Sequence, residues 1–262
     1  MITSTQNRTI KKIRKLSSRR GRKKSGKCLI EGIQQVLSAL ENGAAVQMIV
    51  ICPDLLTSEI AYDRVQKSQE RGVRILRVSE EVFNSISRRD NPVGIAAVAE
   101  IQYQNPEQLE LQEQSVITAL MGINDPGNLG TIIRTVDATG GAGIVLLGNT
   151  TDPFAPRAIK ASVGTVFSVP LIQFGETDDF MQFIRTKGLF LITTSAHAPQ
   201  DITQVRFDYP CAILLGDEYQ GLPVDLLEYG DLQVRIPICG QASSLNLAVA
   251  AGIFLYEANI FR

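Results

Sequence analysis

Three short segments in the second half of the chain combine glycines with side chains that could bind a ligand. The first covers residues 124–130 (NDPGNLG) and is followed by Arg134 and Asp137. A Pro-Gly turn and a helix N-terminus use Gly and Asn for structural reasons alone, so this loop by itself is weak support for a site. If the helix begins near Leu129, Arg134 lies about one and a half turns along it, and its side chain can reach a ligand at the loop.

The second segment covers residues 214–222 (LLGDEYQGL), where an apolar strand ends in Gly216 and Gly221 with carboxylates between them. Glycines after a strand allow the backbone to approach a ligand closely. The segment contains neither the GxGxxG pattern of a dinucleotide site nor the Lys-Ser/Thr of a phosphate loop. Taken alone, it fits a strand-to-helix turn as well as it fits a binding site.

The third segment covers residues 236–246 (IPICGQASSLN) and leads into an apolar helix predicted over Leu247–Ile260. Ser243 or Ser244 could be the N-cap of that helix, which is the usual role of serine at this place. Asn246 would then lie in the first turn of an otherwise apolar helix and would need a hydrogen-bond partner.

Short apolar segments surround these loops and predict a sheet. The predicted strands alternate with helices and are Ser115–Gly122, Gly143–Leu147, Val166–Ile172, Leu189–Thr194 and Cys211–Leu215. Continuous apolar strands separated by helices indicate an α/β fold with a mostly parallel sheet covered on both faces. Such sheets bind ligands beyond the carboxyl ends of their strands, which is where the glycine-containing loops lie.

The segment before this sheet predicts a smaller α/β domain. Helices are expected over Glu31–Asn42, over residues 57–71 and after the N-cap Ser79, and strands over Val46–Cys52, Val73–Val78 and Gly94–Ala99. The polar stretch QYQNPEQLELQEQ is interpreted as a linker. The predicted organisation is therefore a basic arm (1–27), an α/β domain (28–101), a linker (102–114) and a second α/β domain (115–262).

The first 27 residues hold 11 of the 26 basic residues of the chain, and the first acidic residue is Glu31. The remaining chain has 15 basic and 27 acidic residues, a net charge of −12. A basic arm on an acidic body favours a polyanionic partner, because each phosphate that it neutralises releases counterions. The alternative is a solvated tail without a role. If the arm binds phosphates, its deletion should weaken binding of the polyanion and flatten the salt dependence of binding.

Composition excludes several classes of protein. With 44% apolar residues and a mean hydropathy of +0.06, the chain is typical of a globular protein, and its longest apolar run, Leu245–Leu255, is too short to span a membrane. The basic N-terminus leads into more charge rather than an apolar stretch, so no secretory signal is expected. Four scattered cysteines and one histidine predict neither a zinc site nor disulfides, and indicate a cytoplasmic protein without a metal.

Taken together, the three loops resemble those of the SpoU (TrmH-type) family of RNA ribose 2′-O-methyltransferases. The family pattern runs NxGxxxR, then GxExxG, then a proline-headed loop that ends in Ser-Leu-Asn. The matching residues here are Asn128, Gly130 and Arg134, then Gly216, Glu218 and Gly221, then Pro237, Gly240, Ser244, Leu245 and Asn246. The chain departs from the family at Ala248, where a small polar residue is frequent, and at Ile238, where methionine is frequent. Residues 31–100 also look like the substrate-binding domain of ribosomal-protein type that the family carries.

The resemblance implies a trefoil-knotted C-terminal domain, a homodimer and S-adenosylmethionine as the methyl donor, with RNA as the substrate. The implied donor site is made by Gly216, Ile236 and Leu245, together with Leu215 and Thr194. Arg134 is implied near the acceptor ribose. The implied polar wall beside it consists of Asn128, Glu218, Ser244 and Asn246. Ribosomal RNA is the favoured substrate, since tRNA members of the family often lack a domain like residues 31–100.

Methyl transfer to a hydroxyl is an in-line displacement that requires alignment of two atoms and removal of a proton. The single histidine, His197, is a chemically suitable base, but it matches no family motif and is interpreted as a loop residue. Arg134 is essentially always charged, so we expect it to orient the ribose or phosphate rather than to accept the proton. The alternatives are a tRNA ribose methyltransferase, an enzyme that methylates a base such as guanine at N1, and an RNA-binding protein of the same fold without activity.

Overall fold

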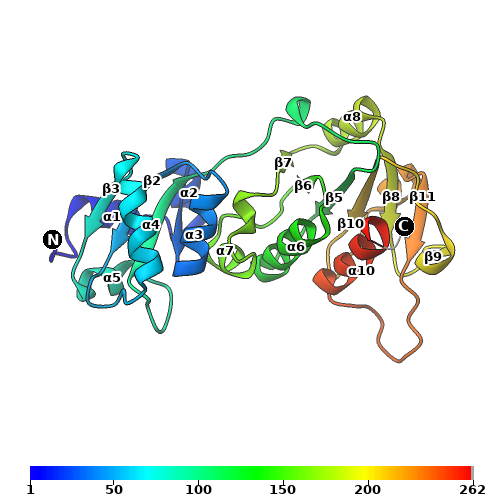
Figure 1. Ribbon diagram of the computed structural model, residues 1–262. Helices are drawn as coiled ribbons and strands as arrows, with labels where there is room; N and C mark the ends of the chain where they lie inside the picture. The colour runs from blue at the N-terminus through cyan, green and yellow to red at the C-terminus, as the bar shows by residue number, and fades with distance from the viewer. Residues whose placement is uncertain (261–262) are drawn as a thin grey trace. The chain divides into compact units, whose positions relative to one another are not determined.

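A computed structural model describes residues 1–260, so the last two residues of the predicted second domain, Phe261 and Arg262, lie outside the described residues. The chain forms two compact units. Unit 1 consists of residues 1–102 and 152–168, and unit 2 of residues 103–151 and the chain from Val169 onward. Each unit is built around its own sheet (Figure 1).

The sheet of unit 2 has seven strands in the order β7-β6-β5-β10-β8-β11-β9, and every pairing in it is parallel. The strands are β5 (Val116–Met121), β6 (Gly143–Leu147), β7 (Leu171–Phe174), β8 (Phe190–Thr194), β9 (Gln200–Asp201), β10 (Cys211–Leu215) and β11 (Leu232–Arg235). The predicted α/β class with a mostly parallel sheet is confirmed. The trefoil knot that the resemblance implies stays a prediction.

Helices cover both faces of this sheet. On one face, Ile117 and Ala119 of β5 pack with Phe180 and Ile184 of α8 (Thr177–Lys187), and Leu226 of α9 (Val224–Tyr229) joins the same core. Because side chains alternate along a strand, the neighbouring residues of β5 face the other side. There α6 (Pro126–Thr139) and α10 (Leu247–Asn259) lie side by side (Figure 1).

The prediction of a strand over Val166–Ile172 is wrong. Residues 166–172 divide into the short 3-10 helix η2 (Thr165–Phe167) and, after Pro170, strand β7, which runs on to Phe174. The backbone turns sharply at Gly164, whose φ is +93°, and Pro170 has no N–H to donate to a sheet. The apolar residues on either side belong to different units, so continuous apolar character did not indicate one strand here.

Unit 1 contains a four-stranded mixed sheet in the order β1-β4-β2-β3. The strands are β1 (Lys27–Glu31), β2 (Val46–Ile51), β3 (Arg74–Arg77) and β4 (Ile95–Glu100), and the helices are α1 (Arg8–Lys15), α2 (Arg19–Ser25), α3 (Ile33–Glu41), α4 (Glu59–Glu70), α5 (Glu80–Ile86) and α7 (Pro156–Ala161). Ser79 is the N-cap of α5, as predicted, and its hydroxyl accepts a hydrogen bond from the N–H of Val82.

The first 27 residues, predicted to be a basic arm, are part of the folded unit 1. They form α1, α2 and the start of β1, and Ile10, Ile13 and Leu16 are buried in the core of unit 1. Apolar residues at positions 10, 13 and 16 have the spacing of one helix face, which the high charge of the segment obscured. Deleting the segment would therefore remove part of a hydrophobic core, so deletion cannot test phosphate binding alone.

The predicted linker is also ordered by contacts with unit 2. It contains the 3-10 helix η1 (Pro106–Gln108), and Leu109 is buried in the core beside α8. The Lys187 ammonium donates hydrogen bonds to the carbonyls of Glu107 and Leu109 at 3.0 and 2.8 Å. None of the helices within residues 1–260 has the length and apolar character that crossing a membrane requires.

Candidate active site

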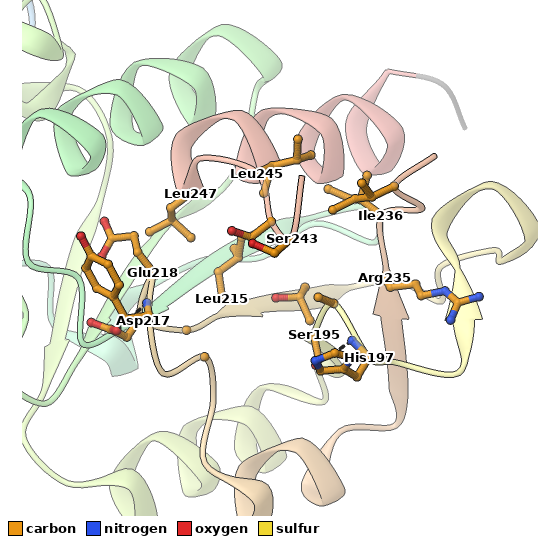
Figure 2. Close-up of a pocket in the computed structure, with 18 of the residues that line it drawn as sticks. Ser195, His197, Leu215, Asp217, Glu218, Arg235, Ile236, Ser243, Leu245 and Leu247 are labelled. Atoms are coloured by element: carbon orange, nitrogen blue, oxygen red, sulfur yellow. Dashed lines mark hydrogen bonds between the residues drawn. The ribbon is translucent and has the colours of Figure 1, made fainter. Parts of the chain in front are cut away.

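A pocket of about 400 Å³ opens in unit 2 at the carboxyl ends of β8, β10 and β11. Its walls come from the loops after these strands and from α10, as Figure 2 shows. The carboxylates of Asp217 and Glu218 lie at one end, and His197 and Arg235 lie at the other. Leu247 and Phe254 of α10 contribute apolar surface. This is the edge of a parallel sheet at which ligands are expected.

All five residues of the predicted donor site line this pocket. They are Thr194, Leu215, Gly216, Ile236 and Leu245. The hydroxyl of Thr194 donates a hydrogen bond of 3.0 Å to the carbonyl of Leu214, so it ties β8 to β10 at the base of the pocket. Residues from three separate loops therefore share one cavity.

Gly216 lies where two backbone segments of the loop of residues 216–222 are too close together to leave room for a side chain. A Cβ atom at this position would lie 2.3 Å from the carbonyl carbon of Gly221 and 2.6 Å from the nitrogen of Leu222. The motif glycine therefore allows the loop of residues 216–222 to close on itself. As a result, backbone rather than a side chain forms this part of the pocket wall.

A hydrogen-bonded series joins one residue from each of the three loops. The amide nitrogen of Asn128 donates to Oε1 of Glu218 at 2.8 Å, and the amide nitrogen of Asn246 donates to Oδ1 of Asn128 at 3.1 Å. Glu218 lines the pocket, so the series fixes a carboxylate at its edge. The predicted need of Asn246 for a partner is met by a residue 118 positions earlier in the chain.

Asn246, rather than Ser243 or Ser244, is the N-cap of α10. Its Oδ1 accepts hydrogen bonds from the N–H groups of Ala248 and Val249 at 2.9 and 3.4 Å. The prediction that a serine caps this helix is therefore wrong. Both serines instead line the pocket.

Arg134 does not line the pocket. Helix α6 begins at Pro126 with Asp125 as its N-cap, and not near Leu129, so Arg134 lies more than two turns from the helix start. Its side chain is exposed. Among the expected catalytic residues, Glu218 and Ser244 line the pocket. Asn128 and Asn246 do not line it but are linked to Glu218 by hydrogen bonds. Arg134 lies on the exposed face of α6.

Several residues that line the pocket were not predicted to belong to the site. Ser195, His197 and Arg235 line the end opposite Glu218, and Arg235 forms an ion pair with Asp201 at 2.5 Å. His197 does belong to a loop, as interpreted, but that loop follows β8 and forms part of the wall. The rule that ligands bind beyond strand ends could have indicated this loop. Within residues 1–260 no group of three or more His, Cys, Asp or Glu side chains is placed to hold a metal ion.

Comparison with known proteins matches both parts of the chain. The model of the SpoU rRNA methylase family matches residues 115–256, and that of an MRM3-like substrate binding domain matches residues 7–97. An uncharacterized tRNA/rRNA methyltransferase of Synechocystis is 34% identical over 98% of this chain and 92% of its own length. The 23S rRNA (guanosine(2553)-2′-O)-methyltransferase RlmP of Bacillus subtilis is 30% identical over 98% of each chain.

Among solved structures, an AdoMet-bound rRNA methyltransferase from Sinorhizobium meliloti superposes with a TM-score of 0.90. It is 36% identical, and the match covers 98% of this chain and 96% of that one. Family model, full-length relatives and fold all agree with the three loops that meet at the pocket. The chain belongs to the SpoU rRNA methylase family.

Proposed function

We propose that this protein transfers the methyl group of S-adenosylmethionine to a ribose 2′-hydroxyl of ribosomal RNA. The observation that carries the proposal is the hydrogen-bonded series Glu218–Asn128–Asn246, which joins the three family motifs at the edge of one pocket. The relatives named above support the reaction, because RlmP is a 23S rRNA 2′-O-methyltransferase and the Sinorhizobium protein binds AdoMet.

The residues that line the pocket are suited to bind the methyl donor, S-adenosylmethionine. The pocket volume of about 400 Å³ suits a nucleoside with a short side chain. Leu215, Ile236, Leu245 and Leu247 offer apolar surface to an adenine ring, and the close loop at Gly216 presents backbone groups. When bound, the donor supplies an activated methyl group on sulfur. The protein has to hold that group in line with the acceptor oxygen.

Glu218 and Asn128 are proposed to hold the acceptor ribose. Since Asn128 donates to Oε1 of Glu218 and accepts from Asn246, its amide cannot rotate without losing one of the two bonds. The carboxylate is thereby fixed as a hydrogen-bond acceptor facing the pocket. It can accept a hydrogen bond from a ribose hydroxyl and increase the electron density on the attacking oxygen. Ser244, which also lines the pocket, provides a further hydroxyl.

Arg134 is proposed to orient the ribose or its phosphate through its planar guanidinium group. Because Arg134 lies outside the pocket of its own chain, we propose that a second copy of the protein completes the site. In a homodimer the partner subunit's Arg134 would face the Glu218 end of the pocket.

The face of α10 that points to solvent supports a dimer. Val249, Ile253 and Ile260 follow one another at helical spacing and are 53%, 38% and 53% exposed. Large apolar side chains in a row on a helix are characteristic of protein interfaces. Ile253→Asp is expected to give monomers in sedimentation, whereas Val224→Asp, at a 67% exposed position on α9, should leave the dimer intact. A monomeric wild-type protein would contradict the homodimer.

A mixing experiment tests the shared site. The Arg134→Ala and Glu218→Ala proteins, each expected to be inactive by itself, are mixed and refolded together. If the arginine comes from the partner, each heterodimer has one complete site, and roughly a quarter of wild-type activity returns. If both residues act within one chain, the mixture stays inactive.

We place the reaction in the cytoplasm. Cys28 and Cys52 are free and buried, and burial raises the pKa of the Cys28 thiol to about 12. Free thiols are typical of proteins in reducing compartments, where ribosomal RNA is also found in bacteria.

The reaction is tested with tritiated S-adenosylmethionine and total RNA from a strain that lacks the protein. We expect label in 23S or 16S RNA, at a nucleotide whose 3′ phosphodiester bond resists alkaline cleavage. Label in tRNA would change the proposed substrate, and label on a base would change the proposed reaction. Donor binding by calorimetry without label in any RNA would indicate a binding protein without activity.

A further inference from the structure

Tyr219 is the most exposed large apolar or aromatic side chain among residues 1–260, with 93% of its surface accessible. It lies in the loop of residues 216–222, directly after Glu218, and borders the same pocket. An aromatic ring that is exposed at the edge of a site is available to stack on a ring of the ligand.

The turn that carries Tyr219 is fixed by hydrogen bonds. Oδ1 of Asp217 accepts from the N–H groups of Tyr219 and Gln220 at 2.8 and 2.9 Å, and the N–H of Gly221 donates to the carbonyl of Asp217 at 3.0 Å. Gly221 adopts a φ of +68°, a conformation that glycine takes without strain. The ring of Tyr219 is therefore presented from an ordered turn rather than from a loose loop.

The same turn is attached to the first motif loop. The amide nitrogen of Asn124 donates to Oδ2 of Asp217 at 2.9 Å. The two backbone N–H groups, followed by the Asn124 amide, hold the pKa of the Asp217 carboxyl below its ordinary value. A lowered pKa means that the carboxylate strengthens the turn at neutral pH and loses this effect only as the pH falls through the lowered value. The two successive carboxylates therefore have different roles. Asp217 fixes the turn, and Glu218 faces the pocket.

We propose that Tyr219 stacks on the base of the nucleotide whose ribose is methylated. The inference rests on the proposed function, which places the acceptor 2′-hydroxyl at Glu218. The base is attached to the carbon next to the one that bears this hydroxyl, so it lies only a few ångströms away. The Cα atom of Tyr219 is about 3.8 Å from that of Glu218, which places the ring within reach of the base.

Stacking suits an enzyme that acts on ribose. Proteins that bind unpaired nucleotides commonly stack splayed bases on aromatic rings, and every base offers such a face. A tyrosine platform holds the nucleoside without contacting base edges, so it would position the acceptor and leave the choice of nucleotide to other contacts. Tyr219 is therefore proposed as a positioning residue for the substrate.

The test compares Tyr219→Ala and Tyr219→Phe with Tyr229→Ala, which removes a 57% exposed tyrosine of the same unit that does not line the pocket. The substrate is a short RNA that contains the site mapped with wild-type protein. We expect kcat/KM for RNA to fall about ten- to a hundred-fold in Tyr219→Ala and to stay near the wild-type value in Tyr219→Phe and Tyr229→Ala. Donor affinity by calorimetry and dimer mass by sedimentation should not change.

A second substrate tests whether Tyr219 acts through the base of the acceptor nucleotide. An RNA with an abasic nucleotide at the acceptor position should react slowly with wild-type protein, and Tyr219→Ala should slow it little further, because ring and base act together. The inference is overturned if Tyr219→Ala equals wild type on the intact RNA, or if the two losses multiply fully. Weakened donor binding would place the ring on the donor, and a change in mass would place it in the dimer interface; either result overturns the inference. Absence of ribose methylation by the wild type would instead reject the proposed function.

Discussion

The two units present different kinds of atoms to a ligand. Unit 1 exposes eight of the eleven cations of its first 27 residues, namely Arg8, Lys11, Lys12, Lys15, Arg19, Arg20, Lys23 and Lys24. The pocket of unit 2 is formed mainly by backbone, hydroxyl and apolar groups, with His197 and Arg235 at one end and the Glu218 carboxylate at the other. Glu218 accepts a hydrogen bond from Asn128, which in turn accepts one from Asn246.

This difference predicts different sensitivity to substitution. A surface of exposed cations binds a polyanion through many weak and interchangeable interactions, so the removal of one is partly compensated by the others. A site defined by hydrogen-bond geometry and close backbone approach has no such reserve. Single substitutions should therefore be severe in the pocket and mild on the cationic surface.

The largest effect is expected for Arg134→Ala, which should lower methyl transfer about 10³-fold or more, as removal of a key electrostatic interaction does. Donor affinity should stay near wild type, since the proposed donor site consists of other residues, namely Thr194, Leu215, Gly216, Ile236 and Leu245. Arg134→Lys should fail as well, because a point charge cannot replace the planar group. Single-turnover kinetics and calorimetry measure the two quantities, and wild-type turnover in Arg134→Ala would remove this residue from the mechanism.

Gly216→Ala should reduce donor affinity by about 100-fold. The added Cβ would lie 2.3 Å from backbone of Gly221, and the loop can relieve this overlap only by opening. Gly175→Ala is the matched control, because Gly175 lies outside the three motif loops and no atom lies within 4 Å of a Cβ at this position. Calorimetric titration of both variants checks the prediction, which fails if they bind the donor equally well.

In unit 1, Arg22→Ala should lower the free energy of unfolding by about 3 kcal/mol, because it leaves a partner carboxylate unpaired. The Arg22 guanidinium is buried, contacts Asp152 at 2.6 Å and donates to the carbonyls of Leu16 and Ser17. Lys23→Ala, at the next and exposed position, should change stability little. Urea unfolding compares them. Equal midpoints would show that this arginine, like its neighbours, serves only as a surface charge.

The smallest effect is expected on the cationic surface. Replacing Lys11, Lys12 and Lys15 by alanine should weaken RNA binding several-fold and reduce the salt slope by about one for each phosphate that is no longer neutralised. The three side chains are exposed, so the core residues Ile10 and Ile13 keep their packing. Filter binding of wild type and variant over a salt series measures the RNA affinity and the salt slope. Identical slopes for wild type and variant would show that these cations do not bind phosphate.

The sequence alone indicated most of the α/β elements and the loops that form the site. Strands β6 and β10 begin and end where the apolar runs predicted, since a strand buried on both faces is continuously apolar. Five residues that line the pocket could be named because the family resemblance rests on local motifs, with glycines and polar residues at fixed spacing after strands. The position of Ser79 as an N-cap is a local property for the same reason.

The pairing of distant segments was decided only by the tertiary structure. The bond between Asn246 and Asn128 joins residues 118 positions apart, and no local pattern indicates which amide meets which. In the sequence Arg22 is one cation among many in a basic segment, and only its pairing with Asp152 places it in a core. Local spacing fixes helices and turns because their hydrogen bonds join residues that are close in the sequence. It indicates strands through their apolar runs, although their partner strands lie far away in the chain. The burial of a charge depends instead on which remote segments the whole chain brings together.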